Sequence, residues 1–292
     1  MHSLIAQMGY IVIATPDFEA AAADLVDILG LRISGRLDDR ILLSSNSRSC
    51  EVAFVHSDDR GIRAVGLEAP NVAAVDEIAR RVTSEGCTIL DDKPSIPRVK
   101  RAVRFRSLFG PILEVHTPVA RESLKPMNDP GVHARRLDHV NIRVSDPHAF
   151  HEFTTKVLGM RLSDRTDDYS RAWYRAGDGF HHTIAAGPGE GLHHYGFDAY
   201  SILDLAAVAD GLVLKGRSLL WGVGRHGPGN NIFSYYIDTN DTVVETSFGM
   251  ERLDENPRDA GVWTDSALAR VFDVWGSTPP SHYSSALTPF VV

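Results

Sequence analysis

The chain repeats one pattern of residues in its two halves, and this repeat constrains its fold more than any other feature. The first copy runs through Met8-Gly-Tyr-Ile-Val-Ile, Asp17 and Leu29-Gly30-Leu31-Arg32. The second runs through Leu137-Asp-His-Val-Asn-Ile, Asp146 and Leu158-Gly159-Met160-Arg161. At 292 residues the chain is long enough for two domains, so the repeat predicts one similar domain in each half.

The two copies differ at the residues that could bind a metal. At a shift of about 130 residues, Tyr10 aligns with His139, Ala64 with His194, and Glu114 with Glu245. Ten of the 13 histidines lie between His133 and His282, in the second half. Only the second copy therefore carries a full His, His, Glu set, and we expect Glu114 to be a structural remnant.

Composition limits the partners and the chemistry. The chain has 30 basic and 38 acidic residues, a net charge of -8, which argues against nucleic acid or an anionic membrane as the main partner. It contains no run of about 18 apolar residues and no signal-peptide pattern, so we expect a cytoplasmic protein. Cys50 and Cys87 are too few for a disulfide framework or a thiolate metal cluster. The chemistry should use histidines and carboxylates.

Hydrophobic patterning predicts a strand, a helix and short strands, twice in each half, which is an α+β fold. Helices are expected at 17–29, 71–86, 147–158 and 201–215, the first ending at Gly30 as its C-cap. Strands are expected at 9–14, 41–43, 50–55, 64–67, 103–105, 111–116, 140–144, 172–174, 182–186, 194–198, 232–237 and 242–246. The expected divisions are a first domain (1–120), a linker (121–136), a second domain (137–250) and a wrapping extension (251–292).

Strand alternation indicates where the second set of side chains points. His139 alternates with Val140 and Ile142, so it should lie on the more polar face of its strand. His194 alternates with Tyr195 in the same way. Glu245 lies in an apolar run, where a lone carboxylate would be costly to bury without a partner such as a metal.

Two histidines and one carboxylate with open coordination positions suit a non-haem Fe(II) enzyme, and zinc uses the same donors. Spacing alone does not choose between these metals. If residues 232–246 form a hairpin across Thr239-Asn240, Tyr235 should lie opposite Glu245. A slip of one residue in that register would move Tyr235 to the other face.

These residues resemble the type I extradiol ring-cleavage dioxygenases of the vicinal oxygen chelate superfamily, of the two-domain catechol 2,3-dioxygenase or 2,3-dihydroxybiphenyl 1,2-dioxygenase type. The resemblance covers essentially the whole chain and is densest from Arg225 to Glu245. There the family has a histidine, a tyrosine nine positions later and a ligand glutamate nineteen positions after the histidine. His226, Tyr235 and Glu245 match this pattern.

The resemblance implies a glyoxalase-like fold in which each domain is built of two βαβββ modules that form a cupped sheet. It implies that His139, His194 and Glu245 bind Fe(II), with Mn(II) as the alternative. It also implies that His182, in the sequence His182-Thr-Ile-Ala185, is the acid/base, with His181 as the alternative, and that His226 and Tyr235 contact the substrate hydroxyls. The implied activity is extradiol cleavage of a substituted catechol by O2, in a homo-oligomer that degrades aromatic compounds.

Two other functions fit the same residues. One is a divalent-metal isomerase or lyase built on the same paired modules, and the other is a non-catalytic protein that binds an aromatic ligand. Fold alone does not separate these functions. The ring substituents of the catechol are also not determined by these patterns.

Overall fold

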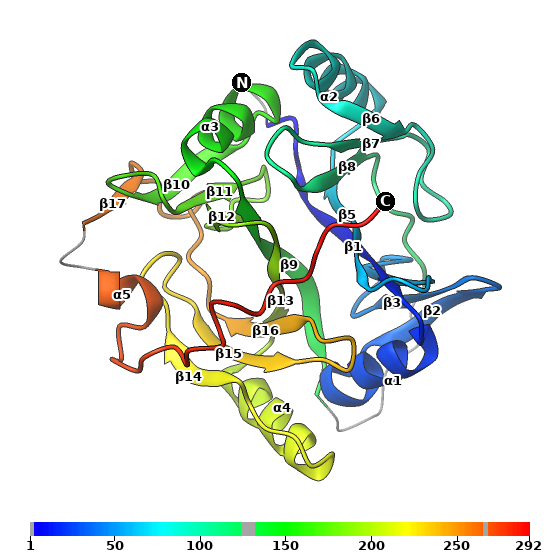
Figure 1. Ribbon diagram of the computed structural model, residues 1–292. Helices are drawn as coiled ribbons and strands as arrows, with labels where there is room; N and C mark the ends of the chain where they lie inside the picture. Colours follow the sequence, from blue (N-terminus) through cyan, green and yellow to red (C-terminus); the bar gives the residue numbers. More distant parts are fainter. Residues whose placement is uncertain (1–2, 124–131, 265–267) are drawn as a thin grey trace.

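The computed structural model describes residues 3–123, 132–264 and 268–292, and these residues form two mixed β-sheets (Figure 1). The first sheet has eight strands in the order β2-β3-β4-β1-β5-β8-β7-β6, and the second has nine in the order β14-β15-β16-β13-β9-β12-β11-β10-β17. Each half of the chain is a pair of βαβββ modules. The α+β, glyoxalase-like fold that the sequence predicts is confirmed.

The first half contains two helices among its strands. Its elements are β1 (Gln7–Thr15), α1 (Phe18–Leu29), β2 (Arg32–Leu37), β3 (Arg40–Ser44), β4 (Val52–His56), β5 (Gly61–Glu68), α2 (Val72–Ser84), β6 (Thr88–Asp91), β7 (Ala102–Arg106) and β8 (Ile112–His116). The two modules join where β1 pairs antiparallel with β5.

The second half repeats this order. Its elements are β9 (Ala134–Val144), α3 (Pro147–Glu152), the π-helix η1 (Phe153–Val157), β10 (Arg161–Thr166), β11 (Ala172–Arg175), β12 (Ile184–Pro188), β13 (Gly191–Ala199), α4 (Ile202–Leu214), β14 (Trp221–Arg225), β15 (Ile232–Ile237) and β16 (Val243–Phe248). The tail adds β17 (Gly261–Trp263) and α5 (Leu268–Phe272). The single helix expected at 147–158 is thus an α-helix that continues as a π-helix.

Several of the repeated residues are helix caps. Asp17 and Asp146 precede α1 and α3, and each carboxylate accepts a hydrogen bond of 2.9 Å from a backbone N–H in the first turn. Gly30 caps the end of α1 with φ of 66°, as expected, and Gly159 has φ of 69° at the matching position. Glycine adopts this left-handed conformation without the steric cost of a side chain. The repeat therefore marks where each helix begins and ends.

One face of each sheet packs into a hydrophobic core that both halves share. On β1, Ile11 and Ile13 belong to this core, and on β9 Val140 and Ile142 do. Helix α1 contacts α4, and α2 contacts η1, so helices of the two halves pack against each other (Figure 1). The other face of each sheet faces away from this core, and the two halves differ there.

The first strand after each helix was not located by the sequence patterns. These strands are β2, β6, β10 and β14. Three of them are the terminal strands of their sheets, and β10 is next to the terminal β17. Strands at a sheet edge bury little apolar surface, so they lack the alternation by which a strand is recognised.

The linker and the tail also differ from the expected divisions. Strand β9 begins at Ala134, inside the segment expected to be a linker, and residues 124–131 of that segment lie outside the described residues. The tail crosses both sheets, where Thr288 bridges to Leu192 of β13 and Phe290 to Ile62 of β5 (Figure 1). No helix among the described residues is long and apolar enough to span a membrane.

Candidate metal centre

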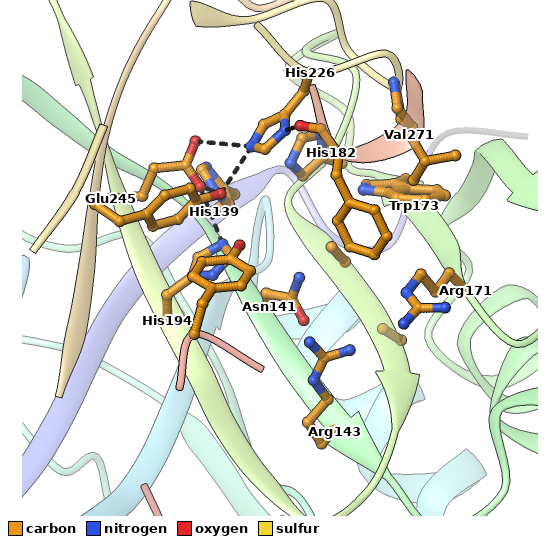
Figure 2. Close-up of a pocket in the computed structure, with 16 residues that line it drawn as sticks. His139, Asn141, Arg143, Arg171, Trp173, His182, His194, His226, Glu245 and Val271 are labelled. Atoms are coloured by element: carbon orange, nitrogen blue, oxygen red, sulfur yellow. Dashed lines mark hydrogen bonds and ion pairs between the residues drawn. The ribbon is translucent and has the colours of Figure 1, made fainter. Parts of the chain in front are cut away.

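His139, His194 and Glu245 come together on three adjacent strands of the second sheet (Figure 2). They lie on β9, β13 and β16, and all three side chains are at least 97% buried. The Nε2 atoms of His139 and His194 each lie 3.1 Å from Oε2 of Glu245. The three potential ligand atoms all lie within 4.8 Å of one another. The structure therefore brings the predicted His, His, Glu set to one point.

Gly196 on the central strand makes room for this cluster. It pairs with His139 on one side and with Glu245 on the other. A Cβ atom at Gly196 would lie 2.2 Å from the ring of His139. A glycine in a strand interior is typical of such a close approach. Gly66 has the same place in the first sheet, where a Cβ would lie 2.7 Å from the ring of Tyr10.

Carboxylates on both sides orient His139. Its Nδ1 lies 2.8 Å from Asp138, while its Nε2 faces Glu245. Burial lowers the pKa of His139, but Asp138 and Glu245 outweigh it and raise the pKa to about 10. The negative charge around this ring therefore favours a cation at the centre. A donated Nδ1–H to a carboxylate is also the usual arrangement of a histidine whose Nε2 binds a metal.

A relay of hydrogen bonds orients His194. Nε2 of His193 lies 2.8 Å from the carbonyl oxygen of Tyr283, which only accepts, so this nitrogen carries the proton. Nδ1 of His193 is then an acceptor, and it lies 2.7 Å from Nδ1 of His194. His194 must therefore donate through Nδ1, which leaves the lone pair of its Nε2 directed at Glu245.

A β-bulge places His193 beside His194. Strict alternation would send His193 to the opposite face of β13, but the register with β9 shifts between Leu192 and His194. A bulge inserts an extra residue and re-aims the side chains next to it. His193 is not among the three donors that converge, and it is instead the hydrogen-bond partner of His194.

A divalent metal fits these donors. Two imidazole nitrogens and one carboxylate oxygen converge on one point. Burial lowers the pKa of His194 to about 4, so this ring stays neutral at pH 7. The raised pKa of His139 keeps a proton between its Nε2 and Glu245, and a bound metal ion would take the place of this proton.

His182 lies beside the centre and His181 lies behind it. His182 lines the pocket from the loop before β12, with its ring centroid 4.7 Å from that of His139. Nδ1 of His181 lies 3.0 Å from Nδ1 of His182, and Nε2 of His181 lies 3.4 Å from Asp164. Burial, and then the charge of His139, lower the pKa of His182 well below its usual value. Of the two predicted alternatives, the structure places His182 in the pocket.

His226 and Tyr235 also line the pocket. Tyr235 pairs with Glu245 across the β15–β16 hairpin, so the register expected from the sequence is confirmed. Nδ1 of His226 donates to the carbonyl oxygen of Phe272 at 2.6 Å, and its Nε2 therefore accepts from the hydroxyl of Tyr235 at 2.7 Å. Burial raises the pKa of Tyr235 well above its usual value, so the hydroxyl keeps its proton at neutral pH.

The matching position of the first sheet is closed. The hydroxyl of Tyr10 donates directly to Glu114, which also accepts from the backbone N–H of Ser95 at 2.9 Å. Apolar side chains such as Val12 and Ala64 fill the rest of this face. Within the described residues, the His, His, Glu group of the second sheet is the one set of three or more such donors that could hold a metal.

Some residues of the site were not found from the sequence. Asp138 directly precedes His139, and His193 directly precedes His194. A polar residue next to each candidate ligand could have indicated a hydrogen-bond partner for it. Phe272 and Tyr283 reach the pocket from the tail, and no pattern in the sequence indicates this. Arg143 and Arg171 also line the pocket.

Comparison with known proteins assigns the family. The family model described as the Glyoxalase/Bleomycin resistance protein/Dioxygenase superfamily matches residues 7–115 and 136–251, which together cover most of the chain. The chain belongs to this superfamily. Both halves match, as the internal repeat predicts, and the resemblance to extradiol enzymes falls within the same superfamily.

Two curated members of the superfamily show similarity in sequence. Metapyrocatechase 2 of Cupriavidus necator is 28% identical over 153 residues, which cover 51% of this chain and 47% of that protein. The manganese-dependent 2,3-dihydroxybiphenyl 1,2-dioxygenase of Geobacillus genomosp. 3 is 22% identical over 271 residues, 82% of this chain and 83% of that protein. The match to the first of these relatives thus spans about half of its length.

Solved structures of the superfamily have the same fold. The Mn(II)-bound glyoxalase from Novosphingobium aromaticivorans superposes with a TM-score of 0.86 at 26% identity, covering 98% of this chain and 94% of that one. Homoprotocatechuate 2,3-dioxygenase from Brevibacterium fuscum, in complex with 3,4-dihydroxyphenylacetate, gives a TM-score of 0.90 at 20% identity, covering 98% and 93%. At 20% identity, the similarity to the second structure shows a shared fold and nothing more.

Proposed function

We propose that this chain is an extradiol dioxygenase that cleaves a catechol ring with O2, using Fe(II) or Mn(II) held by His139, His194 and Glu245. The observation that carries the proposal is the arrangement of the pocket around these residues. His182 and the hydrogen-bonded pair Tyr235–His226 all line the pocket that contains the three donors. A metal bound there would leave open positions at which catechol and O2 are brought together and can exchange electrons.

Two groups of side chains in the pocket suit the two protons of a catechol. If Nδ1 of His181 accepts from Nδ1 of His182, Nε2 of His182 is left as a proton acceptor in the pocket. The hydroxyl of Tyr235 donates to His226, so its oxygen can accept from a substrate hydroxyl. Each catechol oxygen thus has an acceptor that can take or share its proton.

His182 also has the properties of the general acid. Once it has taken a proton from the substrate, its low pKa in this buried site favours giving the proton back. His182 would return this proton to an oxygen atom of the product as the ring opens. His181 and Asp164 hold the ring of His182 in place during both transfers.

The decisive experiment supplies metal, substrate and O2 in order. The chain is stripped of metal, loaded under nitrogen with Fe(II) or Mn(II), mixed with a catechol and then exposed to air. We expect one O2 consumed per catechol and a yellow ring-opened product. The variant His194→Ala should lose this activity, whereas Tyr10→Phe, at the aligned position of the first ligand in the other sheet, should keep it. Full activity in His194→Ala would contradict the proposed metal centre.

A metal-dependent isomerase is the second candidate, because the matched Mn(II)-bound structure is that of a glyoxalase. The same experiment separates the two functions. An isomerase needs no O2, so conversion of substrate under nitrogen would favour it, and strict dependence on O2 would exclude it. Assembly as a homo-oligomer and a cytoplasmic location also stay predictions, and light scattering of the purified protein would test the first.

A further inference from the structure

Two arginines share the pocket with the metal centre. Arg143 lies on β9, four residues after His139 on the same face, and is 8% exposed. Arg171 directly precedes β11 and lines the pocket together with Trp173. Figure 2 shows both guanidinium groups on the side of the pocket away from Glu245, with Asn141 between Arg143 and the histidines. The pocket thus has a metal-binding end and a cationic end.

Neither guanidinium has an ion-pair or hydrogen-bond partner among the described residues. No carboxylate oxygen there lies within 4.0 Å of either group, and neither donates a side-chain hydrogen bond there. Elsewhere this protein does pair a buried arginine, since Arg48, 4% exposed, lies 2.7 Å from Glu51. A buried cation without a counter-charge is costly. Of the two arginines that are buried within the described residues, Arg48 and Arg143, the one without an ion pair is therefore Arg143.

The fold holds this unpaired arrangement in place. Gly187 pairs with Arg143 across the β9–β12 ladder, and a Cβ atom there would lie 2.2 Å from Nη1 of Arg143. The guanidinium of Arg171 lies over the ring of Phe272, with its carbon 5.3 Å from the ring centroid. Burial, and to a smaller extent the charge of Arg171, lower the pKa of Arg143 to about 10, so it is charged at neutral pH. The positively charged guanidinium groups of Arg143 and Arg171 thus both line the same pocket.

We propose that Arg143 and Arg171 bind a carboxylate group carried by the substrate, which makes carboxylated catechols the substrate class of this site. This inference rests on the proposed dioxygenase function. Four residues of strand separate the α-carbons of His139 and Arg143 by about 13 Å. The arginines therefore lie beyond the atoms that bind the metal and face a substituent at the far side of the ring. A carboxylate accepts paired hydrogen bonds from guanidinium groups and neutralises their charge.

The test measures binding rather than turnover. Metal-free protein under nitrogen is titrated with four catechols in a calorimeter. These are 3,4-dihydroxybenzoate, 3,4-dihydroxyphenylacetate and the methyl ester of each acid. We expect at least one of the acids to bind about tenfold or more tightly than its ester. Arg143→Gln and Arg171→Gln should each abolish most of that preference. Arg36→Gln, at an exposed arginine of the first sheet, should leave it unchanged.

Either of two results would overturn the inference: equal binding of acid and ester by the wild type, or an unchanged preference in both pocket variants. If Arg143→Gln fails to fold, as thermal melting would show, Arg171→Gln decides, because Arg171 is at the end of a strand and is less buried. A chain that binds the acids but cleaves no catechol would contradict the dioxygenase function alone. A chain that cleaves catechols without preferring the acids would contradict this inference alone.

Discussion

The Nδ1 atoms of His193 and His194 lie 2.7 Å apart, and this contact determines which nitrogen of His194 faces Glu245. His193 is itself fixed by the carbonyl oxygen of Tyr283, a residue of the tail. The tail therefore sets the tautomer of a residue that we propose to bind the metal. A contact between Tyr283 and the metal itself is not needed for this effect.

Replacing His193 should weaken metal binding without removing a ligand. In His193→Phe the ring keeps its packing against Tyr283, but Nδ1 of His194 loses its acceptor, and the wrong tautomer becomes accessible. Loss of such an orienting partner typically costs about 10–100-fold in metal affinity. Competition with a chelator would measure this. The control is His148→Phe, whose side chain lies outside the pocket; equal affinity in wild type and His193→Phe would show that the relay has no such role.

Gly196 in the second sheet and Gly66 at the same place in the first sheet provide a matched pair of variants. Gly196→Ala should push the ring of His139 away from Glu245, and Gly66→Ala should displace Tyr10 in the same manner. Each should destabilise the fold by about 1–3 kcal/mol, because the added methyl overpacks a filled interior. We expect metal affinity to fall in Gly196→Ala alone. Urea unfolding and metal titration of both variants would check this, and a similar loss of affinity in both would contradict it.

His182→Asn should reduce turnover while metal binding is retained. The side chain is a candidate proton acceptor and donor beside the centre, and removal of such a group typically lowers kcat by about 10²–10⁴-fold. KM for the catechol should change little, because Tyr235 and the metal would still hold its oxygens. Steady-state kinetics with O2 consumption would measure both constants. A variant with wild-type kcat would remove His182 from the mechanism.

Asp238 should make stability depend on pH. It lies in the turn between β15 and β16 and accepts hydrogen bonds from Tyr195, Asn240 and Thr242. Burial raises the pKa of its carboxyl from 3.8 to about 6. The folded state thus binds more protons than the unfolded state between these values, so this group lowers stability as pH rises towards 6, and its cost is complete above that pH.

The expected result is a gain in the wild type of ~1 kcal/mol at pH 5 over pH 7, relative to Asp238→Asn, which cannot titrate at this position. Chemical unfolding of both proteins at the two pH values would measure it. Other titrating groups are common to both proteins and cancel in the comparison. An equal pH dependence in the two would show that this carboxyl titrates normally in the fold.

Much of the site could be predicted because its determinants are local. Alternation along β9 put His139 on the face opposite Val140, and the hairpin symmetry placed Tyr235 opposite Glu245, as the structure has them. Strict alternation does not describe the strand around His193, because a bulge in β13 changes the register there. Whether a strand contains a bulge depends on its neighbour as well as on its own residues.

By itself, the sequence determined the duplicated modules, the helix C-cap at Gly30, and the half that carries both histidines and the glutamate. These features depend on residues within a few positions of one another. Only the tertiary structure decided that Tyr283 orients His193, that Phe272 supports His226 and that Arg143 and Arg171 share one pocket. Such contacts join distant parts of the chain, and packing sets them, since a residue carries no local sign of which remote surface it will meet.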